Sequence, residues 1–130
     1  MKHLKLALIM ILLSVQPVWA EFKLVGEQDS KTYFIDFDSI KKDGNFRMVW
    51  VIINLPTPSK NGALSWKNRI EYDCYEERSR TQRSYEHSEA MGRGEVVRTI
   101  IATKPGMWFQ VRPDTNNNAH RKILNLICAK

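Results

Sequence analysis

The segment FRMVWVIINL, residues 46–55, predicts the central strand of a β-sheet. Alternate side chains of a strand point to opposite faces. One face would carry the even-numbered apolar residues from Phe46 to Ile52, and the other would carry Val49, Val51 and Ile53. Apolar residues on both faces indicate a strand that is covered on most of each side, and a helix would supply the second cover. We therefore expect an α+β fold, in which a sheet packs against a helix.

The segments around this strand predict the rest of the sheet. Residues 56–62 contain Pro56 and Pro58 and should form a loop, because strand interiors exclude proline. Residues 66–74 alternate strictly, with Trp66 and Ile70 on one face and Lys67 on the other. Shorter runs predict further strands at residues 22–27, 31–37, 78–86, 95–101 and 107–111.

The C-terminal residues follow a helical period. The apolar stripe consists of Ala119, Ile123, Leu126 and Ile127, with Leu124 beside it. The opposite, polar stripe consists of Asn118, Arg121, Lys122 and Asn125. Asp114 or Thr115, which follow Pro113, would cap this helix. The helix would therefore cover the sheet with its apolar stripe.

The first twenty residues have the pattern of a cleavable export signal. Basic residues from Lys2 to Lys5 precede the apolar run 6–15, and Ala20 supplies the small residue of a cleavage site. The uncharged stretch 6–20 is shorter than the roughly 20 helical residues that span a bilayer. We expect cleavage after residue 20 and one exported domain, residues 21–130, in the periplasm or the medium. A transmembrane segment or lipid-acceptor cysteine is not expected in the mature chain.

Two cysteines, Cys74 and Cys128, remain after this cleavage. An even pair in an exported chain predicts a disulfide. A redox role would need a nearby partner such as a Cys-x-x-Cys motif, which the sequence lacks. Closing this long loop would contribute about 4 kcal/mol, a large share of the roughly 5–15 kcal/mol that stabilises a small domain. The bridge would attach the predicted helix to the strand that ends at Cys74.

The charge pattern argues against nucleic acid and suggests a modest cationic surface. The formal net charge is +6, and removal of Lys2 and Lys5 would lower it by two charges. Nucleic-acid-binding domains concentrate charge on one face much more heavily. The candidate partner-binding residues are the cations Lys67, Arg69, Arg78, Arg80, Arg121 and Lys122. If the two strands align their faces, the first four would form a patch for acidic protein segments or sulfated glycans. In the alternative interpretation, the acidic neighbours between Glu71 and Glu77 neutralise this patch.

The sequence predicts no catalytic, metal or cofactor site. Neither His87 nor His120 has a cysteine or carboxylate at metal-ligand spacing. The Gly92-Arg93-Gly94 segment precedes a strand rather than a helix, which favours a turn over a phosphate loop. A Gly-x-Ser-x-Gly nucleophile motif is also absent.

The burial of one tryptophan and the formation of a homodimer remain open questions. Trp50 and Trp66 are expected in the core, whereas Trp108 lies near a predicted turn and could instead belong to a stacking surface. An edge strand would allow a homodimer to form by strand pairing, and the polar strand 78–86 could serve.

A set of short motifs, in order along the chain, resembles the surface-adhesin protein E family of Gram-negative bacteria. These motifs are Tyr33-Phe34-Ile35-Asp36, Ser39-Ile40, Asp43-Gly44, Val49-Trp50-Val51, Glu71-Tyr72-Asp73-Cys74, Gly92-x-Gly94-Glu95-Val96-Val97, Pro105-Gly106 with Trp108, and Ile127-Cys128. The resemblance implies a six-stranded antiparallel sheet packed with a helix, and it supports the Cys74–Cys128 bridge. The matching positions look structural, and they bring no catalytic or ligand residues with them.

The resemblance also implies a function. We expect a non-enzymatic, exported protein that binds another protein, with host extracellular-matrix or serum proteins as partners. The alternative is a soluble periplasmic accessory protein that binds an envelope partner or a small apolar ligand. A wide hydrophobic pocket near Trp108 and Phe109 would favour this alternative.

Overall fold

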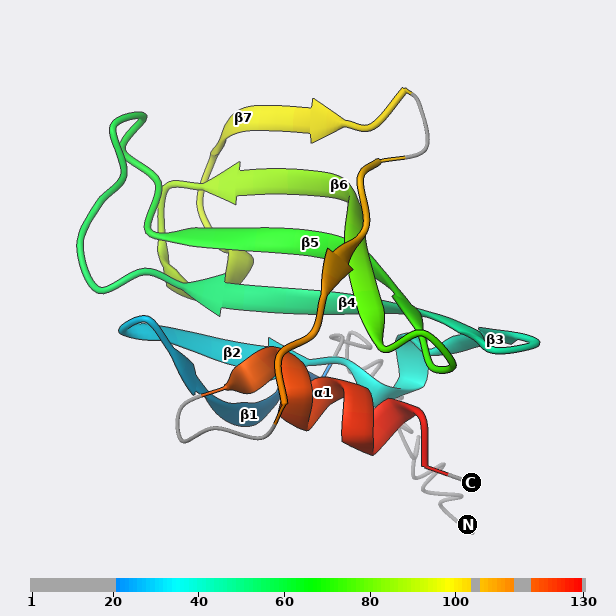
Figure 1. The fold of residues 1–130 in the computed structure, drawn as a ribbon. Coiled ribbons are helices and arrows are strands. Elements are labelled where there is room, and N and C mark those ends of the chain that lie inside the picture. Colours follow the sequence, from blue (N-terminus) through cyan, green and yellow to red (C-terminus); the bar gives the residue numbers. More distant parts are fainter. Residues whose placement is uncertain (1–20, 104–105, 114–117, 130) are drawn as a thin grey trace, which may run out of the picture.

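The computed structural model describes residues 21–103, 106–113 and 118–129. These residues form one antiparallel sheet and one C-terminal helix (Figure 1). The strands are β1 (Lys23–Gln28), β2 (Lys31–Ile35), β3 (Lys41–Asp43), β4 (Phe46–Asn54), β5 (Ser65–Asp73), β6 (Arg78–His87), β7 (Val96–Ile101) and β8 (Phe109–Gln110). The helix is α1 (Ala119–Ile127), and two short 3-10 turns are η1 (Phe37–Ser39) and η2 (Ala90–Gly92). The expected α+β class is confirmed, whereas the expected export signal lies outside the described residues.

The strand order of the sheet confirms the predicted central strand. Six strands follow one another in the order β1-β2-β4-β5-β6-β7, while β3 pairs with β4 and β8 pairs with β6. β4 pairs with β5 along its whole length, from Phe46 opposite Asp73 to Asn54 opposite Ser65. The resemblance therefore implied the correct number of main strands, to which two short ones are added.

The predicted strand 107–111 is much shorter than expected. β8 has two residues, Phe109 and Gln110, which pair with Ser79 and Arg78 at the start of β6. The same edge of β6 is already occupied by β7 from Arg83 onward. Only the first residues of β6 are therefore left for β8.

Strand pairing also corrects the predicted dimer edge. β6 lies between β5 on one side and β7 with β8 on the other, so it offers no free edge. Within the described residues, the main strands with one neighbour are β1 and β7.

The core lies between α1 and one face of the sheet. The odd-numbered residues of β4, Val49, Val51 and Ile53, are buried there with Ile123 and Ile127 of the helix. The disulfide Cys74–Cys128 closes this layer, with its Cα atoms 5.7 Å apart across a sequence separation of 54. Both the helical cover and the bridge were predicted correctly, because each follows from a local pattern in the sequence.

The opposite face of β4 is covered only in part. Ile52 is buried because η2 lies over it, and a Cβ at Gly92 would lie 3.3 Å from the Ile52 Cδ1 atom. Met48 and Trp50 are half-buried, and Phe46 is exposed. The prediction of apolar cover thus holds fully for one face of β4 and partly for the other.

The faces of α1 differ from the prediction at two positions. Arg121 is buried rather than exposed, and Leu126 is exposed rather than buried. The buried arc of the helix is centred on Ile123 and Ile127 and reaches round to Arg121. The reason is that the segment 106–113 also packs on this helix, so a second side of α1 is covered. The Asn118 side chain caps the helix by accepting from Arg121 N, and the expected caps at 114 and 115 lie outside the described residues.

Candidate functional site

The four cations predicted on β5 and β6 do share one surface. We define the outer face as the side of β4, β5 and β6 that points away from α1. Cross-strand partners lie on the same side of a sheet. Trp50 is opposite Arg69, Glu71 is opposite Arg80, and Asp73 is opposite Arg78. The outer face therefore carries the side chains of Lys67, Arg69, Arg78 and Arg80.

A β-bulge adds a fifth cation to the outer face. The register of β5 with β6 shifts between Arg69 and Ile70, so that Arg83 pairs with Arg69 while Thr81 pairs with Ile70. Gln82 is the extra residue of this bulge. A regular strand would place Arg83 on the side opposite Arg80, but one inserted residue returns it to the same side.

Two of the cations are neutralised by acidic neighbours. Arg80 lies 2.7 Å from the Glu71 carboxylate, and Arg78 lies 3.0 Å from that of Asp73. Burial alone would raise the pKa of Asp73, but backbone donors from Glu76 and Tyr75 and the Arg78 side chain lower this pKa overall. For Arg78 and Arg80, the alternative interpretation that acidic neighbours neutralise the cations is correct.

Lys67, Arg69 and Arg83 form the unneutralised part of the outer face. Among the described residues, none of the three has a carboxylate partner within salt-bridge distance. The Lys67 Nζ atom lies 5.4 Å from the ring centroid of Trp50, which stacks on Tyr85 at 6.2 Å. We call these five residues the Trp50 cluster. Trp50 is therefore a half-buried surface residue rather than the core residue we expected.

A second aromatic group covers the neutralised cations. Trp108 lies 4.1 Å from the guanidinium of Arg80 and 4.6 Å from that of Arg78, measured to the ring centroid. Its ring also stacks on Phe46 at 6.0 Å. The open question about Trp108 is thus answered, because this half-buried residue stacks on the outer face. Trp66, by contrast, packs against the core as predicted.

The comparisons with known proteins match this fold. The sequence model of the surface-adhesin protein E family matches residues 22–129. The chain belongs to this family. No curated protein sequence matches the chain.

Solved structures of protein E show the same fold as this family member. One structure of Haemophilus influenzae protein E is 21% identical over 86% of each chain, with a TM-score of 0.59. A second crystal form is 23% identical, covers 75% of this chain and 80% of that chain, and has a TM-score of 0.55. Protein E from non-typeable Haemophilus influenzae is 18% identical, covers 87% of this chain and 80% of that chain, and has a TM-score of 0.54. At these identities the likeness concerns the fold alone.

Family membership supports two general statements about function. The family is one of surface adhesins, which are typically non-enzymatic, and it indicates an exported protein. Within the described residues, no helix is long and apolar enough to cross a membrane.

The two candidate cations on α1 of this adhesin-family chain do not extend the outer face. Arg121 is buried and paired with Glu77 at 3.0 Å, and it donates to the carbonyl oxygens of Val111 and Arg112. Lys122 is exposed, and its side chain lies against Gly26 of β1. The helix covers the other side of the sheet, so the six candidate residues occupy separate surfaces.

The two histidines have structural surroundings. His120 is half-buried, and its Nδ1 atom lies 3.0 Å from the Tyr72 hydroxyl. Burial lowers the pKa of His120. Burial and then the nearby charge of Lys67 lower the pKa of His87, which ends β6. In the part of the chain that the structure describes, no group of three His, Cys, Asp or Glu residues could hold a metal ion.

Proposed function

We propose that this protein is an exported, non-enzymatic adhesin whose outer face binds acidic segments of host extracellular-matrix or serum proteins. Membership of the surface-adhesin family supports a protein partner. The Trp50 cluster carries the proposal, because it combines three unneutralised cations with two stacked aromatic rings. The export signal at residues 1–20, which remains a prediction, supports a location in the periplasm or beyond it.

The chemistry of this cluster fits an anionic protein segment. Opposite charges attract over several ångströms at a partly dry surface, and salt screens this attraction with a Debye length of about 8 Å at physiological ionic strength. Exposed tryptophan and tyrosine rings contribute contact area at a low entropic cost, and both are common in protein interfaces. A partner that presents carboxylates beside apolar side chains would meet both features of the cluster.

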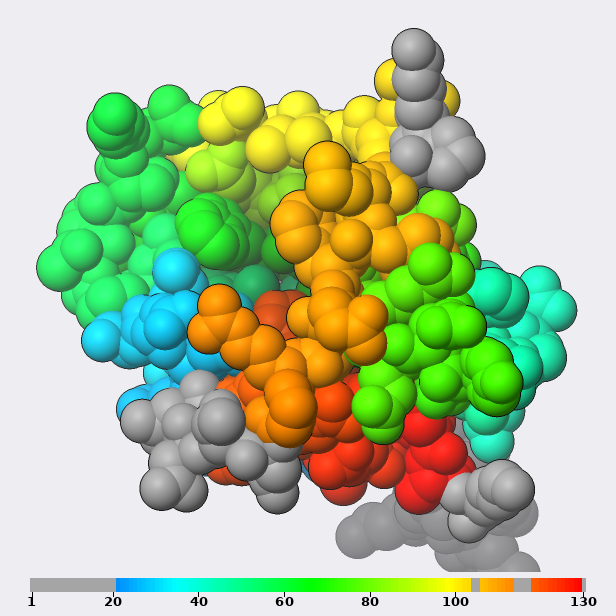
Figure 2. Space-filling view, in the orientation of Figure 1, coloured from blue at the N-terminus to red at the C-terminus, as the bar shows by residue number. Residues whose placement is uncertain are grey.

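The surroundings of Phe109 argue against the alternative of an apolar ligand. Trp108 stacks on Phe46 at the outer face, whereas Phe109 lies opposite Ser79 and lines a different hollow with it, so the two rings do not form one pocket. Figure 2 shows a hollow between the β1–β2 turn and the segment 106–113. Phe109 lines this hollow of about 700 Å³, together with mainly polar residues such as Gln28, Thr81 and His120. Such a lining does not favour an apolar molecule.

Location is the first test of this function. Cells that make the protein would be fractionated, and intact cells would be probed with antibody. Detection at the surface or in the medium is expected for a protein that meets a host partner. Confinement to the periplasm would contradict a host role.

Binding to a panel of purified matrix and serum proteins is the second test. The triple variant Lys67→Gln, Arg69→Gln, Arg83→Gln should lose most of the affinity, and wild-type binding should weaken as salt rises from about 50 to 150 mM. Lys122→Gln is the matched control, because it removes an exposed cation on the other side of the sheet. Equal loss in both variants, or binding that persists at high salt, would contradict an electrostatic outer face.

A further inference from the structure

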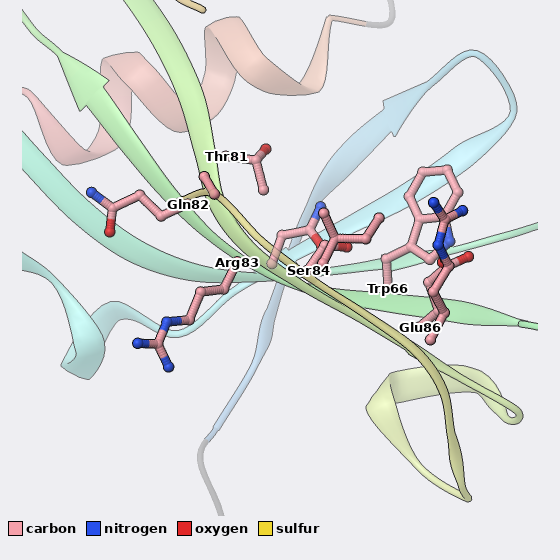
Figure 3. Close-up of a pocket in the computed structure, with 10 residues that line it drawn as sticks. Trp66, Thr81, Gln82, Arg83, Ser84 and Glu86 are labelled. Atoms are coloured by element: carbon pink, nitrogen blue, oxygen red, sulfur yellow. The ribbon is translucent and has the colours of Figure 1, made fainter. Parts of the chain in front are cut away.

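A small cavity lies on the inner side of the sheet, the side that faces α1, beyond the end of the helix. Several of its lining side chains carry buried polar atoms. The cavity has a volume of about 370 Å³ and lies over β5, β6 and β7 (Figure 3). Its lining includes Trp66, Asn68, Ser84, Glu86, Arg98 and Ile100. This volume falls within the range of roughly 300–1,000 Å³ that is common for small-molecule sites.

Three buried polar atoms of these lining residues have no hydrogen-bond partner among the described residues. They are Trp66 Nε1, Asn68 Oδ1 and Glu86 Oε2. Asn68 is only 7% exposed and Glu86 only 6% exposed, so bulk water does not satisfy these groups. Buried polar groups are nearly always paired, and an unpaired one needs an explanation such as an ordered water, an ion or a ligand that binds beside it. All three atoms belong to side chains that line one cavity, which indicates that a hydrogen-bonding molecule belongs beside them.

The arrangement of these atoms limits the chemistry of that molecule. Trp66 and Glu86 are direct cross-strand neighbours, and Figure 3 shows their side chains next to one another. One offers a donor and the other an acceptor, while Asn68 Oδ1 adds a second acceptor. The ligand must therefore both donate and accept within a short distance. A hydroxyl group does both.

The charges of the cavity favour a neutral ligand. The Arg98 Nε atom lies 3.5 Å from Glu86 Oε2, which balances the carboxylate without forming a hydrogen bond to it. Arg83 also lines the cavity, but its side chain points away from Trp66 and Glu86 (Figure 3). Lys31, whose Nζ atom lies 5.6 Å from the Trp66 ring centroid, does not line the cavity. A charged ligand would leave one member of the Glu86–Arg98 pair unbalanced, which a neutral one avoids.

We propose that this cavity binds a small neutral saccharide, of one or two sugar rings. Its hydroxyl groups would accept from Trp66 Nε1, donate to Asn68 Oδ1, and bridge Glu86 to Arg98. The apolar C–H surface of a sugar ring would lie against Trp66 and Ile100, which supply apolar wall. Trp66, Asn68 and Glu86 lie on the opposite side of the sheet from the outer face, so the proposal does not rest on the protein-binding function.

The test uses the disulfide-linked protein, residues 21–130, labelled with ¹⁵N. N-acetylglucosamine, its β-1,4-linked disaccharide, glucose and galactose are titrated separately into the low millimolar range. At least one of them should shift the indole N–H signal of Trp66 saturably, while the signals of Trp50 and Trp108 stay in place. An absence of shifts with all four sugars, or equal shifts at all three tryptophans, would overturn the proposal.

Two conservative variants test the hydrogen bonds directly by calorimetry. Trp66→Phe keeps an aromatic ring but removes the donor, and Asn68→Leu keeps the size but removes the acceptor. Each should weaken binding by about tenfold, as expected for the loss of one hydrogen bond. Trp50→Phe, on the outer face, should bind as the wild type does.

Thermal unfolding of the same variants separates binding from folding. Asn68→Leu removes a buried polar atom that has no partner, so its melting temperature should not fall. Trp66→Phe also removes part of a ring that packs against the core, so a modest fall is expected for this variant beside its loss of affinity. Reduced melting temperatures with unchanged affinity would assign these residues a structural role and overturn the proposal. The outer-face double variant Lys67→Gln, Arg69→Gln should retain saccharide binding, so that failure of either proposal can be recognised separately. Arg83 is left unchanged in this variant because it also lines the cavity.

Discussion

The Tyr72 hydroxyl and the Nδ1 atom of His120 lie 3.0 Å apart, and they join the buried face of β5 to the first turn of α1. The Tyr33 ring approaches the same imidazole edge-on, with ring centroids 5.2 Å apart. Burial raises the pKa of Tyr72, so its hydroxyl keeps its proton and can donate it to Nδ1. Burial lowers the pKa of His120 and so favours its neutral form, which can accept this proton at Nδ1.

We expect the protein to lose stability on acidification below about pH 6.5. The pKa of His120 is lowered in the folded state, so the unfolded chain binds more protons in this range and stability falls as the pH falls. Melting temperatures at pH 7.5 and about pH 5 would show this loss, and His120→Gln should reduce it. His87→Gln is the matched comparison, because the lowered pKa of His87 makes its own contribution to the loss of stability at low pH, which this variant measures separately. A pH dependence that is the same in wild type and His120→Gln would contradict this account.

Removal of the disulfide should strongly destabilise the fold. The double variant Cys74→Ser, Cys128→Ser releases a loop closed across 54 positions, and we expect a loss of about 4 kcal/mol in the free energy of unfolding. Urea denaturation of the oxidised wild type and the variant would measure it. Reduced wild-type protein should behave like the variant. A loss below about 1 kcal/mol would mean that the helix is held by its apolar contacts alone.

Arg121 and Lys122 are neighbours in the sequence, but their substitution is expected to change the free energy of unfolding by very different amounts. Arg121→Ala should cost about 2–3 kcal/mol, because it removes the Arg121 donors to the carbonyl oxygens of Val111 and Arg112 and the pair with Glu77. The Arg112 oxygen then keeps only the Asn118 amide as a side-chain donor. Lys122→Ala should change stability by less than about 0.5 kcal/mol, since its side chain is exposed. Chemical denaturation of both variants would compare them. Similar losses in the two would contradict the buried role of Arg121.

Trp108 should stabilise the outer face through its two guanidinium contacts. Trp108→Leu should cost about 1–2 kcal/mol, from the loss of cation–π and aromatic stacking. Met107→Leu, at an exposed neighbouring position, should be nearly neutral. Denaturation followed by circular dichroism would measure both. A neutral Trp108→Leu would show that the segment 106–113 is held without this ring.

Local patterns were sufficient to predict much of the fold. The apolar run of β4, the strict alternation of β5 and the helical period of α1 are each patterns within a single element. Each pattern can therefore be recognised without knowledge of the tertiary structure, and the packing of the helix on the sheet follows from them. The disulfide needed only two cysteines and an exported chain. Which apolar face of β4 is buried could not be predicted, because both faces carry apolar residues. Trp50 was assigned to the core for this reason.

The outer face depended on a feature that the sequence does not mark. β6 carries polar residues on both faces, so nothing in its pattern specifies its register or the bulge at Gln82. The position of Arg83 beside Arg69 could therefore not be predicted. Likewise, the burial of Arg121 depends on the packing of the segment 106–113, which helical periodicity cannot reveal.

The position of Cys128 has a consequence for the order of assembly. During synthesis or passage through a membrane, N-terminal segments emerge first, and α1 emerges after all the strands of the sheet. The strands from β1 to β5 can pair early, but Cys74 has no disulfide partner until Cys128 has emerged. The bridge therefore closes only after the helix is made, and a product truncated before residue 128 would keep a free thiol at Cys74.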